Sequence, residues 1–104
     1  MNDFPHDYSI ERKELRLRLK VRQFDAAVLP EFKQALDAAW KPDTLRVVLE
    51  LSAVELIDSS GVGALLSVQK RLPAKGEAVI LRGARPAIVS VLELLRLHRV
   101  FRLE

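Results

Sequence analysis

The chain has 104 residues, of which 49% are hydrophobic and 30% are charged, and its 17 Lys and Arg against 14 Asp and Glu give a formal net charge of +3 at pH 7. This length suits a single domain over residues 1–104, because two independently folding units would each bury only a marginal core. The sequence has no cysteine and no apolar stretch near the roughly 18 residues of a membrane helix, which excludes disulfides, thiolate metal sites and membrane insertion.

Residues 1–8 are expected to form a flexible start to this domain. The opening segment, MNDFPHDYSI, has neither the basic region nor the apolar region of a secretory signal, which favours a cytoplasmic location. Basic residues are scattered among acidic ones, and no recognisable DNA- or RNA-binding motif accompanies them. We therefore expect most of them to form a solvated face, with no direct binding of nucleic acid.

The segment 15–22, LRLRLKVR, alternates aliphatic residues with cations. A period of two predicts a strand with one buried face and one row of cations that faces water. Two interpretations of the cations are open. They either discourage edge pairing with other chains, which we favour, or form a stripe that binds phosphate.

A helix and a buried strand come next. Apolar residues of the segment 29–40 recur with the spacing of one helical face, and Pro30 suits the first turn of this helix. Asp25 lies just upstream, in the turn that enters the helix. After the break at KPDT, the run LRVVLELS places Val47 and Val48 side by side, which indicates a central strand covered on both faces.

The second half of the chain alternates strands with helices. A helix is predicted from residue 59 to about residue 72, a short strand over 78–83, a helix over 84–100 and a last strand in VFRLE. This alternation predicts an α/β fold, in which a mostly parallel sheet of four or five strands packs against about three or four helices. The first hairpin adds an antiparallel element, so the sheet is mixed.

The stretch 57–64, IDSSGVGA, is small and polar in an otherwise aliphatic and charged chain. Asp58 or Ser59 can cap the following helix by accepting a hydrogen bond from a first-turn amide. Gly61 and Gly63 each cost about 1 kcal/mol of helix propensity relative to Ala, which suggests a benefit elsewhere. That benefit is either access for a partner surface or phosphoryl group, or tight packing of the helix on the sheet, and the sequence leaves both open.

Three segments between residues 15 and 101 combine into a family pattern. They are the hairpin with the helix entry FDAAVLPEFKQAL, the stretch LRVVLELSAVELIDSSGVGALLSVQKRL, and the end RPAIVSVLELLRLHRVF. The middle segment is the most specific, because it joins a hydrophobic strand, an Asp-Ser-Ser-Gly-hydrophobic-Gly turn and a helix in that order. With these features the chain resembles the STAS domain of bacterial anti-sigma-factor antagonists.

The resemblance implies a STAS-like single domain that is not an enzyme and needs no cofactor. It implies that Ser59, the first hydroxyl residue after the Asp, accepts a phosphate from an anti-sigma factor with serine kinase activity, and that a serine phosphatase removes it. The nucleotide would be contacted only through the partner kinase, and the unphosphorylated form would bind that kinase. The residues expected at this contact are Asp25, Asp58, Ser59, Ser60, Gly61 and Gly63.

Departures from the family pattern keep a second class of function open. Relatives often carry Gly-Glu-Leu-Asp where this chain has RQFD, although Asp25 is retained. STAS-like domains also act as non-enzymatic subunits, for example on the ATPase of a lipid ABC transporter or in stress-signalling scaffolds. An enzyme is not expected, because no histidine neighbours Ser59 in sequence and SSGVGA lacks the Lys of a phosphate-binding loop.

Four further residues have two interpretations each. His6 and His98 are more simply surface histidines than metal or catalytic groups, because no metal-ligand spacing joins them. Lys70 and Arg71, about three turns beyond Ser59 on the predicted helix, are either rim contacts for an acidic partner or solvated cations. We prefer the second interpretation at this stage.

Overall fold

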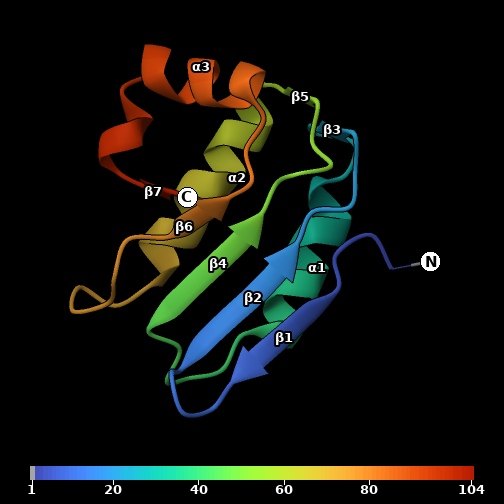
Figure 1. Ribbon diagram of the computed structural model, residues 1–104. Helices are drawn as coiled ribbons and strands as arrows, with labels where there is room; N and C mark the ends of the chain where they lie inside the picture. The colour runs from blue at the N-terminus through green and yellow to red at the C-terminus, as the bar shows by residue number, and fades with distance from the viewer. Residues whose placement is uncertain (1) are drawn as a thin grey trace.

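The computed structural model describes residues 2–104 as a five-stranded mixed sheet with helices on one face (Figure 1). The strands in spatial order are β1 (His6–Ser9), β2 (Glu14–Arg18), β4 (Arg46–Glu50), β6 (Ile80–Arg82) and β7 (Arg102–Leu103). Only β1 is antiparallel to its neighbour, and the other pairs are parallel. The predicted fold class and the antiparallel first hairpin are therefore confirmed.

A second, smaller ladder lies beyond the carboxyl ends of the central strands. It pairs β3 (Gln23–Phe24) with β5 (Leu56–Ile57) in parallel. This ladder was not predicted, because each of its strands is only two residues long and leaves no periodic pattern. It lies at the same end of the molecule as helix α3 (Figure 1).

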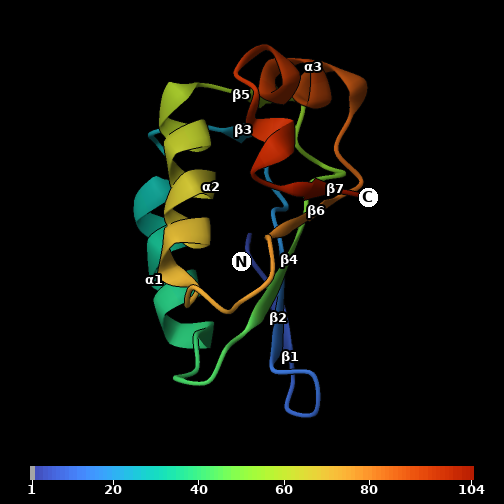
Figure 2. The same cartoon turned by 90° about the vertical axis from the view of Figure 1, so that its left-hand side faces the viewer.

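The helices are α1 (Leu29–Ala39), α2 (Ser59–Arg71) and α3 (Pro86–Leu94), followed by the 3₁₀ turn η1 (Leu97–Arg99). Figure 2 shows α1 and α2 side by side against one face of the sheet, with α3 at the end of the molecule where β3 and β5 lie. The helix predicted over 84–100 ends earlier than expected. Arg96 adopts a left-handed backbone with φ of 60°, a conformation typical of the residue that terminates a helix.

The flexible start expected over residues 1–8 differs from what the structure shows for residues 2–8. Phe4 is 1% exposed and packs edge-to-face on Phe32 of α1, with ring centroids 5.4 Å apart. The amide of Arg18 donates to the Pro5 carbonyl at 2.9 Å, and β1 then pairs with β2. A buried ring and a strand partner together hold this segment, whereas Met1 lies outside the described residues.

The strand β4 is central, as the adjacent valines predicted. Val47 and Val48 are each 1% exposed, but helices cover only the Val47 side of the sheet. On the other side Val48 lies in register between Arg16 of β2 and Ile80 of β6. Long neighbouring side chains bury it there, because the methylene stem of an arginine can lie along an apolar surface.

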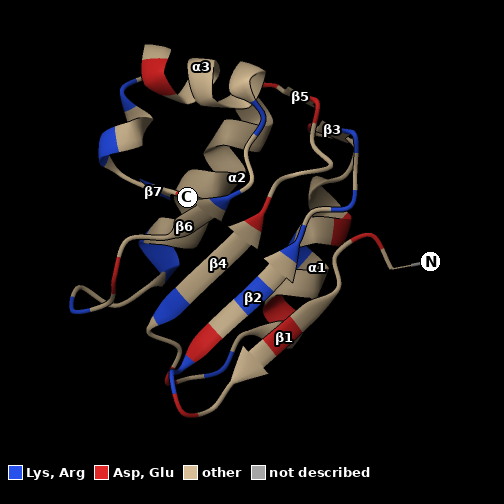
Figure 3. Ribbon diagram, viewed as in Figure 1, with Lys and Arg blue, Asp and Glu red and all other residues tan. Residues whose placement is uncertain are grey.

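Figure 3 shows residues of both charges along β2 and β4. On the helix-free face of the sheet their side chains form ion pairs. The alternation of β2 does place its arginines on a water-facing surface, as predicted. The favoured role of discouraging edge pairing is wrong, because β2 lies inside the sheet and its arginines meet carboxylates. Arg16 Nε lies 2.9 Å from Glu14 Oε2, and this hydrogen bond raises the pKa of the arginine. The pairs on this face and its rim are Arg12–Glu14, Arg16–Glu14, Arg18–Glu50, Arg46–Glu77, Arg82–Glu104 and Arg102–Glu104.

Candidate functional site

The two-stranded ladder brings two turns of the sequence together. Phe24 of β3 is in register with Ile57 of β5, so the chain leaves both strands at the same edge, through Asp25 and Asp58. A shallow hollow at this edge is lined by Gln23, Asp25, Leu56, Ile57 and Asp58. The structure thus places the Asp25 turn beside the start of α2.

Asp58 is the cap of α2, and Ser59 is its first residue. The backbone of Asp58 is extended, and its Oδ1 accepts a hydrogen bond from the Gly61 amide at 2.8 Å. Ser59 is exposed and Ser60 is half-buried. Within residues 2–104, no side-chain hydrogen bond involves Ser59, so its hydroxyl stands at the helix start unused by the fold.

The two glycines of the turn serve different purposes. Gly61 is buried, and a Cβ added there would lie 2.1 Å from the Phe24 carbonyl oxygen and 2.8 Å from Ile57 Cγ1. A Cβ at Gly63 would meet nothing within 4 Å. Tight packing therefore explains Gly61, whereas Gly63 leaves open space on the outer face of the helix, one turn from Ser59.

Both carboxylates of the site cap turns and add negative charge beside Ser59. Asp25 Oδ1 accepts from the Ala27 amide at 3.1 Å, and the Asp25 carbonyl accepts from the Val28 amide at 3.2 Å just before α1 begins. Asp58 acts in the same way for α2. The two acids are thus fixed by local backbone bonds, and their positions depend little on long-range packing.

Sequence reasoning missed an apolar side chain and an ion pair at this edge. Leu56 is 60% exposed beside Asp58. Arg22 and Glu55 form an ion pair with two hydrogen bonds at the start of the ladder. Arg22 Nε donates to Glu55 Oε2 at 3.0 Å, and Arg22 Nη2 donates to Glu55 Oε1 at 3.3 Å. The hydrogen bond from Arg22 lowers the pKa of the Glu55 carboxyl and raises that of Arg22. The exposure of residue 56 could not be predicted, because two adjacent apolar residues such as 56 and 57 are typical of a fully buried strand.

The two histidines of the chain lie away from this hollow. His6 lies in β1 and His98 in η1, and neither lines the hollow. Residues 2–104 contain no group of three or more His, Asp or Glu side chains placed to hold a metal ion. Over that range, each helix is too short or too polar to span a bilayer.

The strand, turn and helix around Ser59 lie inside a match to a family model described as "Mlab, STAS domain", which covers residues 6–103. The chain belongs to the STAS domain family. This STAS domain is similar to an anti-sigma-factor antagonist (STAS) domain protein from Planctomyces limnophilus, with 18% sequence identity, coverage of 100% of this chain and 90% of that chain, and a TM-score of 0.84.

Two further similarities involve one protein in two covalent states. The STAS domain resembles the anti-sigma-factor antagonist SpoIIAA in its unphosphorylated form, with 21% identity over 88% of this chain and 82% of that one, and a TM-score of 0.67. It also resembles the Bacillus cell fate determinant SpoIIAA in the phosphorylated form, with 20% identity over 97% and 90% of the two chains and a TM-score of 0.61. What these proteins share with this STAS domain is the fold.

Proposed function

We propose that this STAS domain is a cytoplasmic anti-sigma-factor antagonist. Its unmodified form binds a kinase-type anti-sigma factor through the Ser59 end of α2, which leaves the sigma factor free to direct transcription. The observation that carries the proposal is the exposed Ser59 hydroxyl at the start of a capped helix, beside the Asp25 turn. The similarity to SpoIIAA, a protein of this fold that exists in phosphorylated and unphosphorylated forms, supports it.

The surface around Ser59 has the composition of a small protein contact. Leu56 supplies an exposed apolar anchor, and carboxylates and hydroxyls surround it. Interfaces place their strongest contacts on such central side chains within a polar rim. Gly63 adds room for a partner backbone to approach α2 closely, since nothing within 4 Å occupies the side-chain position. We assign the contact to Asp25, Asp58, Ser59, Ser60 and Gly63, with Leu56 added, whereas Gly61 supports it from inside.

The proposed switch is one phosphoryl transfer. The anti-sigma factor holds ATP and passes its γ-phosphoryl group to Ser59 Oγ, the hydroxyl proton goes to a base of the kinase, and ADP leaves. A serine phosphatase hydrolyses the ester and restores the hydroxyl. The STAS domain contributes the acceptor oxygen alone, which its exposed position allows.

The phosphate ends binding through charge. It adds about −1.5 to −2 charges at the centre of the contact, beside the carboxylates of Asp25 and Asp58. Such a group must be desolvated or matched by new cations when the partner docks. Stranding one buried charge costs about 3 kcal/mol, which corresponds to more than a hundredfold loss of affinity.

The test combines phosphorylation with a binding titration. Incubation with the kinase and ATP, followed by mass spectrometry, is expected to place the phosphate on Ser59 and to weaken binding by about a hundredfold. Ser59→Ala should bind constitutively and resist modification, Ser59→Asp should bind poorly, and Ser60→Ala should remain a substrate. Phosphate on Ser60, or undiminished affinity after full modification of Ser59, would contradict the proposed switch.

A second candidate is a non-enzymatic STAS subunit that binds a partner ATPase permanently, as in a lipid ABC transporter, or that joins a signalling scaffold. The exposed Leu56 favours it, because an apolar anchor serves a permanent contact that needs no covalent change. The two candidates separate in one measurement. A partner that binds with equal affinity to wild type, Ser59→Ala and Ser59→Asp, and that transfers no phosphate, identifies the subunit.

A further inference from the structure

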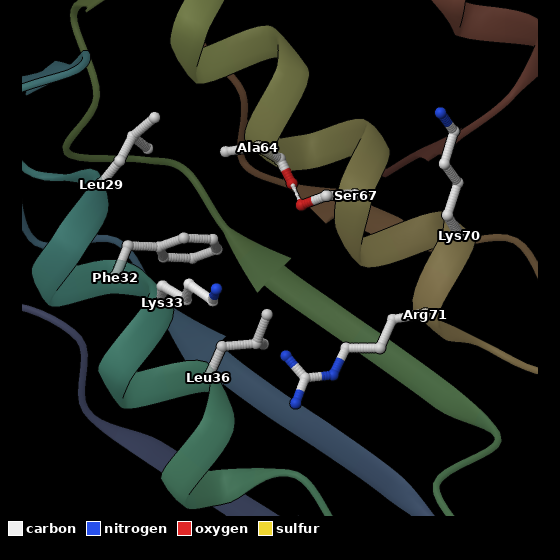
Figure 4. A pocket seen from close by; sticks show the side chains of 8 residues that line it. All are labelled: Leu29, Phe32, Lys33, Leu36, Ala64, Ser67, Lys70 and Arg71. Carbon is white, nitrogen blue, oxygen red and sulfur yellow. Dashed lines mark hydrogen bonds between the residues drawn. The ribbon is translucent and has the colours of Figure 1, made fainter.

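A groove of about 530 Å³ runs between α1 and α2, along the side chains that these helices present toward each other. Figure 4 shows Leu29 and Ala64 toward one end, Lys70 and Arg71 toward the other, and Lys33 on the α1 side between Phe32 and Leu36. The lining residues are Leu29, Phe32, Lys33 and Leu36 of α1 with Ala64, Ser67, Lys70 and Arg71 of α2. None of them belongs to the Ser59 contact.

The cations of the groove differ from those of the sheet. The arginines on the helix-free face are neutralised by carboxylates, as the ion pairs described above show. Among the ion pairs formed within residues 2–104, none involves Lys33 or Lys70. Figure 4 shows the Lys33 side chain extending from α1 into the gap and the Arg71 side chain extending from α2 toward α1. Lys33 therefore brings a cation without an internal ion-pair partner to this groove, opposite Arg71, which pairs with Asp37.

Arg71 is held in place from two sides. Its Nη1 lies 2.7 Å from Asp37 Oδ1, and its guanidinium carbon lies 4.8 Å from the centre of the Trp40 ring. A guanidinium has five N–H donors, so a single hydrogen bond to Asp37 leaves others to bind an anion in the groove. Trp40 is the one tryptophan of the sequence, which makes any displacement of Arg71 visible in its fluorescence.

The groove has no free hydroxyl for a ligand. The one hydroxyl there, Ser67 Oγ, donates to the Ala64 carbonyl of its own helix at 2.6 Å. Leu29, Phe32 and Leu36 line the α1 side over eight residues, about 10 Å at the rise of an α-helix, and Phe32 and Leu36 are only 2% and 4% exposed. A ligand must therefore combine an apolar body of about this length with an anionic head that meets the cations.

We propose that this groove binds a small anionic amphiphile, with its apolar body between α1 and α2 and its carboxylate or phosphate head between Lys33 and Arg71. The groove volume falls within the roughly 300–1,000 Å³ of small-molecule clefts. Its length of about two helical turns is too short for the area of a standard protein interface. The proposal is independent of the Ser59 switch, because the two sites share no residue.

The test uses monomeric octanoate as the probe, with octyl phosphate as the second head group and octylammonium as the matched cation. Octanoate is expected to change Trp40 fluorescence saturably and to shift the backbone amide resonances of Lys33, Ala64 and Ser67. Lys33→Glu should weaken octanoate binding by about tenfold, the loss of about one charge-assisted hydrogen bond. Lys75→Glu makes the same charge change in a loop away from the groove and should leave binding unchanged.

Ser67→Phe is a second variant that keeps every cation but fills the groove with a ring, and it should abolish binding. Thermal unfolding of each variant shows that the fold is intact, and this readout does not depend on the groove. Equal binding of octylammonium, equal losses in Lys33→Glu and Lys75→Glu, or amide shifts confined to other surfaces would overturn the proposal. So would binding to vesicles of phosphatidylglycerol without any binding of monomeric octanoate, because a membrane surface would then be the source of the anion.

Discussion

The sharpest prediction of the structure is that one substitution, Gly→Ala, has opposite effects at two positions of the same helical turn. At Gly61 the new Cβ would lie 2.1 Å from the Phe24 carbonyl oxygen, whereas even close C–H···O contacts keep a carbon–oxygen distance of about 3.3 Å. The obstacle is backbone, which cannot rotate away as a side chain can. Either α2 or the β3 turn must therefore move.

The magnitudes follow from two competing effects. Overpacking a well-filled site costs about 1–3 kcal/mol, and a backbone obstacle belongs at the upper end of that range. The better helix propensity of Ala offsets about 1 kcal/mol of this cost. Gly61→Ala should thus lower the free energy of unfolding by about 2 kcal/mol. Gly63→Ala meets nothing within 4 Å and should raise it by up to about 1 kcal/mol.

Urea unfolding of both variants beside wild type measures the difference. With a slope of about 1–3 kcal/mol per molar urea, a gap of about 3 kcal/mol separates the two midpoints by at least about 1 M. Each variant is the control for the other, because the added methyl group and the helix are the same. A Gly61→Ala protein as stable as wild type, or two midpoints that move in the same direction, would refute the packing argument.

Three other predictions concern the same edge of the molecule. Asp58→Ala should lower the free energy of unfolding by about 1 kcal/mol through loss of the helix cap, and Asp58→Asn should retain most of it, as urea titration will show. Gly63→Arg should be at least as stable as wild type but lose its anti-sigma partner in a pull-down, and unchanged binding would move the contact elsewhere. Because Arg22 lowers the pKa of Glu55, the stabilisation from this pair is present above the usual glutamate range and is lost as pH falls through the lowered value. Wild type and Glu55→Gln should therefore differ in urea midpoint near neutral pH and converge in acid, and a gap that widens in acid would contradict this sign.

The sequence predicted the sheet and its helices because their signals are local. Alternation in 15–22, helical spacing in 29–40 and the valine pair of the central strand each depend on neighbours a few residues away, and the structure confirmed these elements. The turn at Asp58 was also readable, since capping chemistry depends on adjacent residues. Which acid or hydroxyl caps the helix was left open, and the backbone geometry assigns it to Asp58.

The errors came from relations between distant segments. The placement of residues 2–8 depends on Phe4 reaching Phe32, and the pairing of the β2 arginines depends on carboxylates such as Glu50, 32 positions away from Arg18. Neither Phe32 nor Glu50 lies within the few neighbouring residues from which a local sequence pattern is read. The exposure of Leu56 likewise depends on the ladder lying outside the main sheet.

The sequence by itself determined the α/β order of elements and the small polar turn at the start of α2. It also carries the family resemblance that implies Ser59 as the phosphate acceptor. Only the tertiary structure showed why Gly61 and Gly63 differ, because the need for glycine depends on which atoms surround the position that a Cβ would occupy. The structure alone also brought Asp25 beside Asp58 and opened the groove between α1 and α2. Sequence patterns fix which face of an element is apolar, whereas packing fixes which faces meet and which gaps stay open.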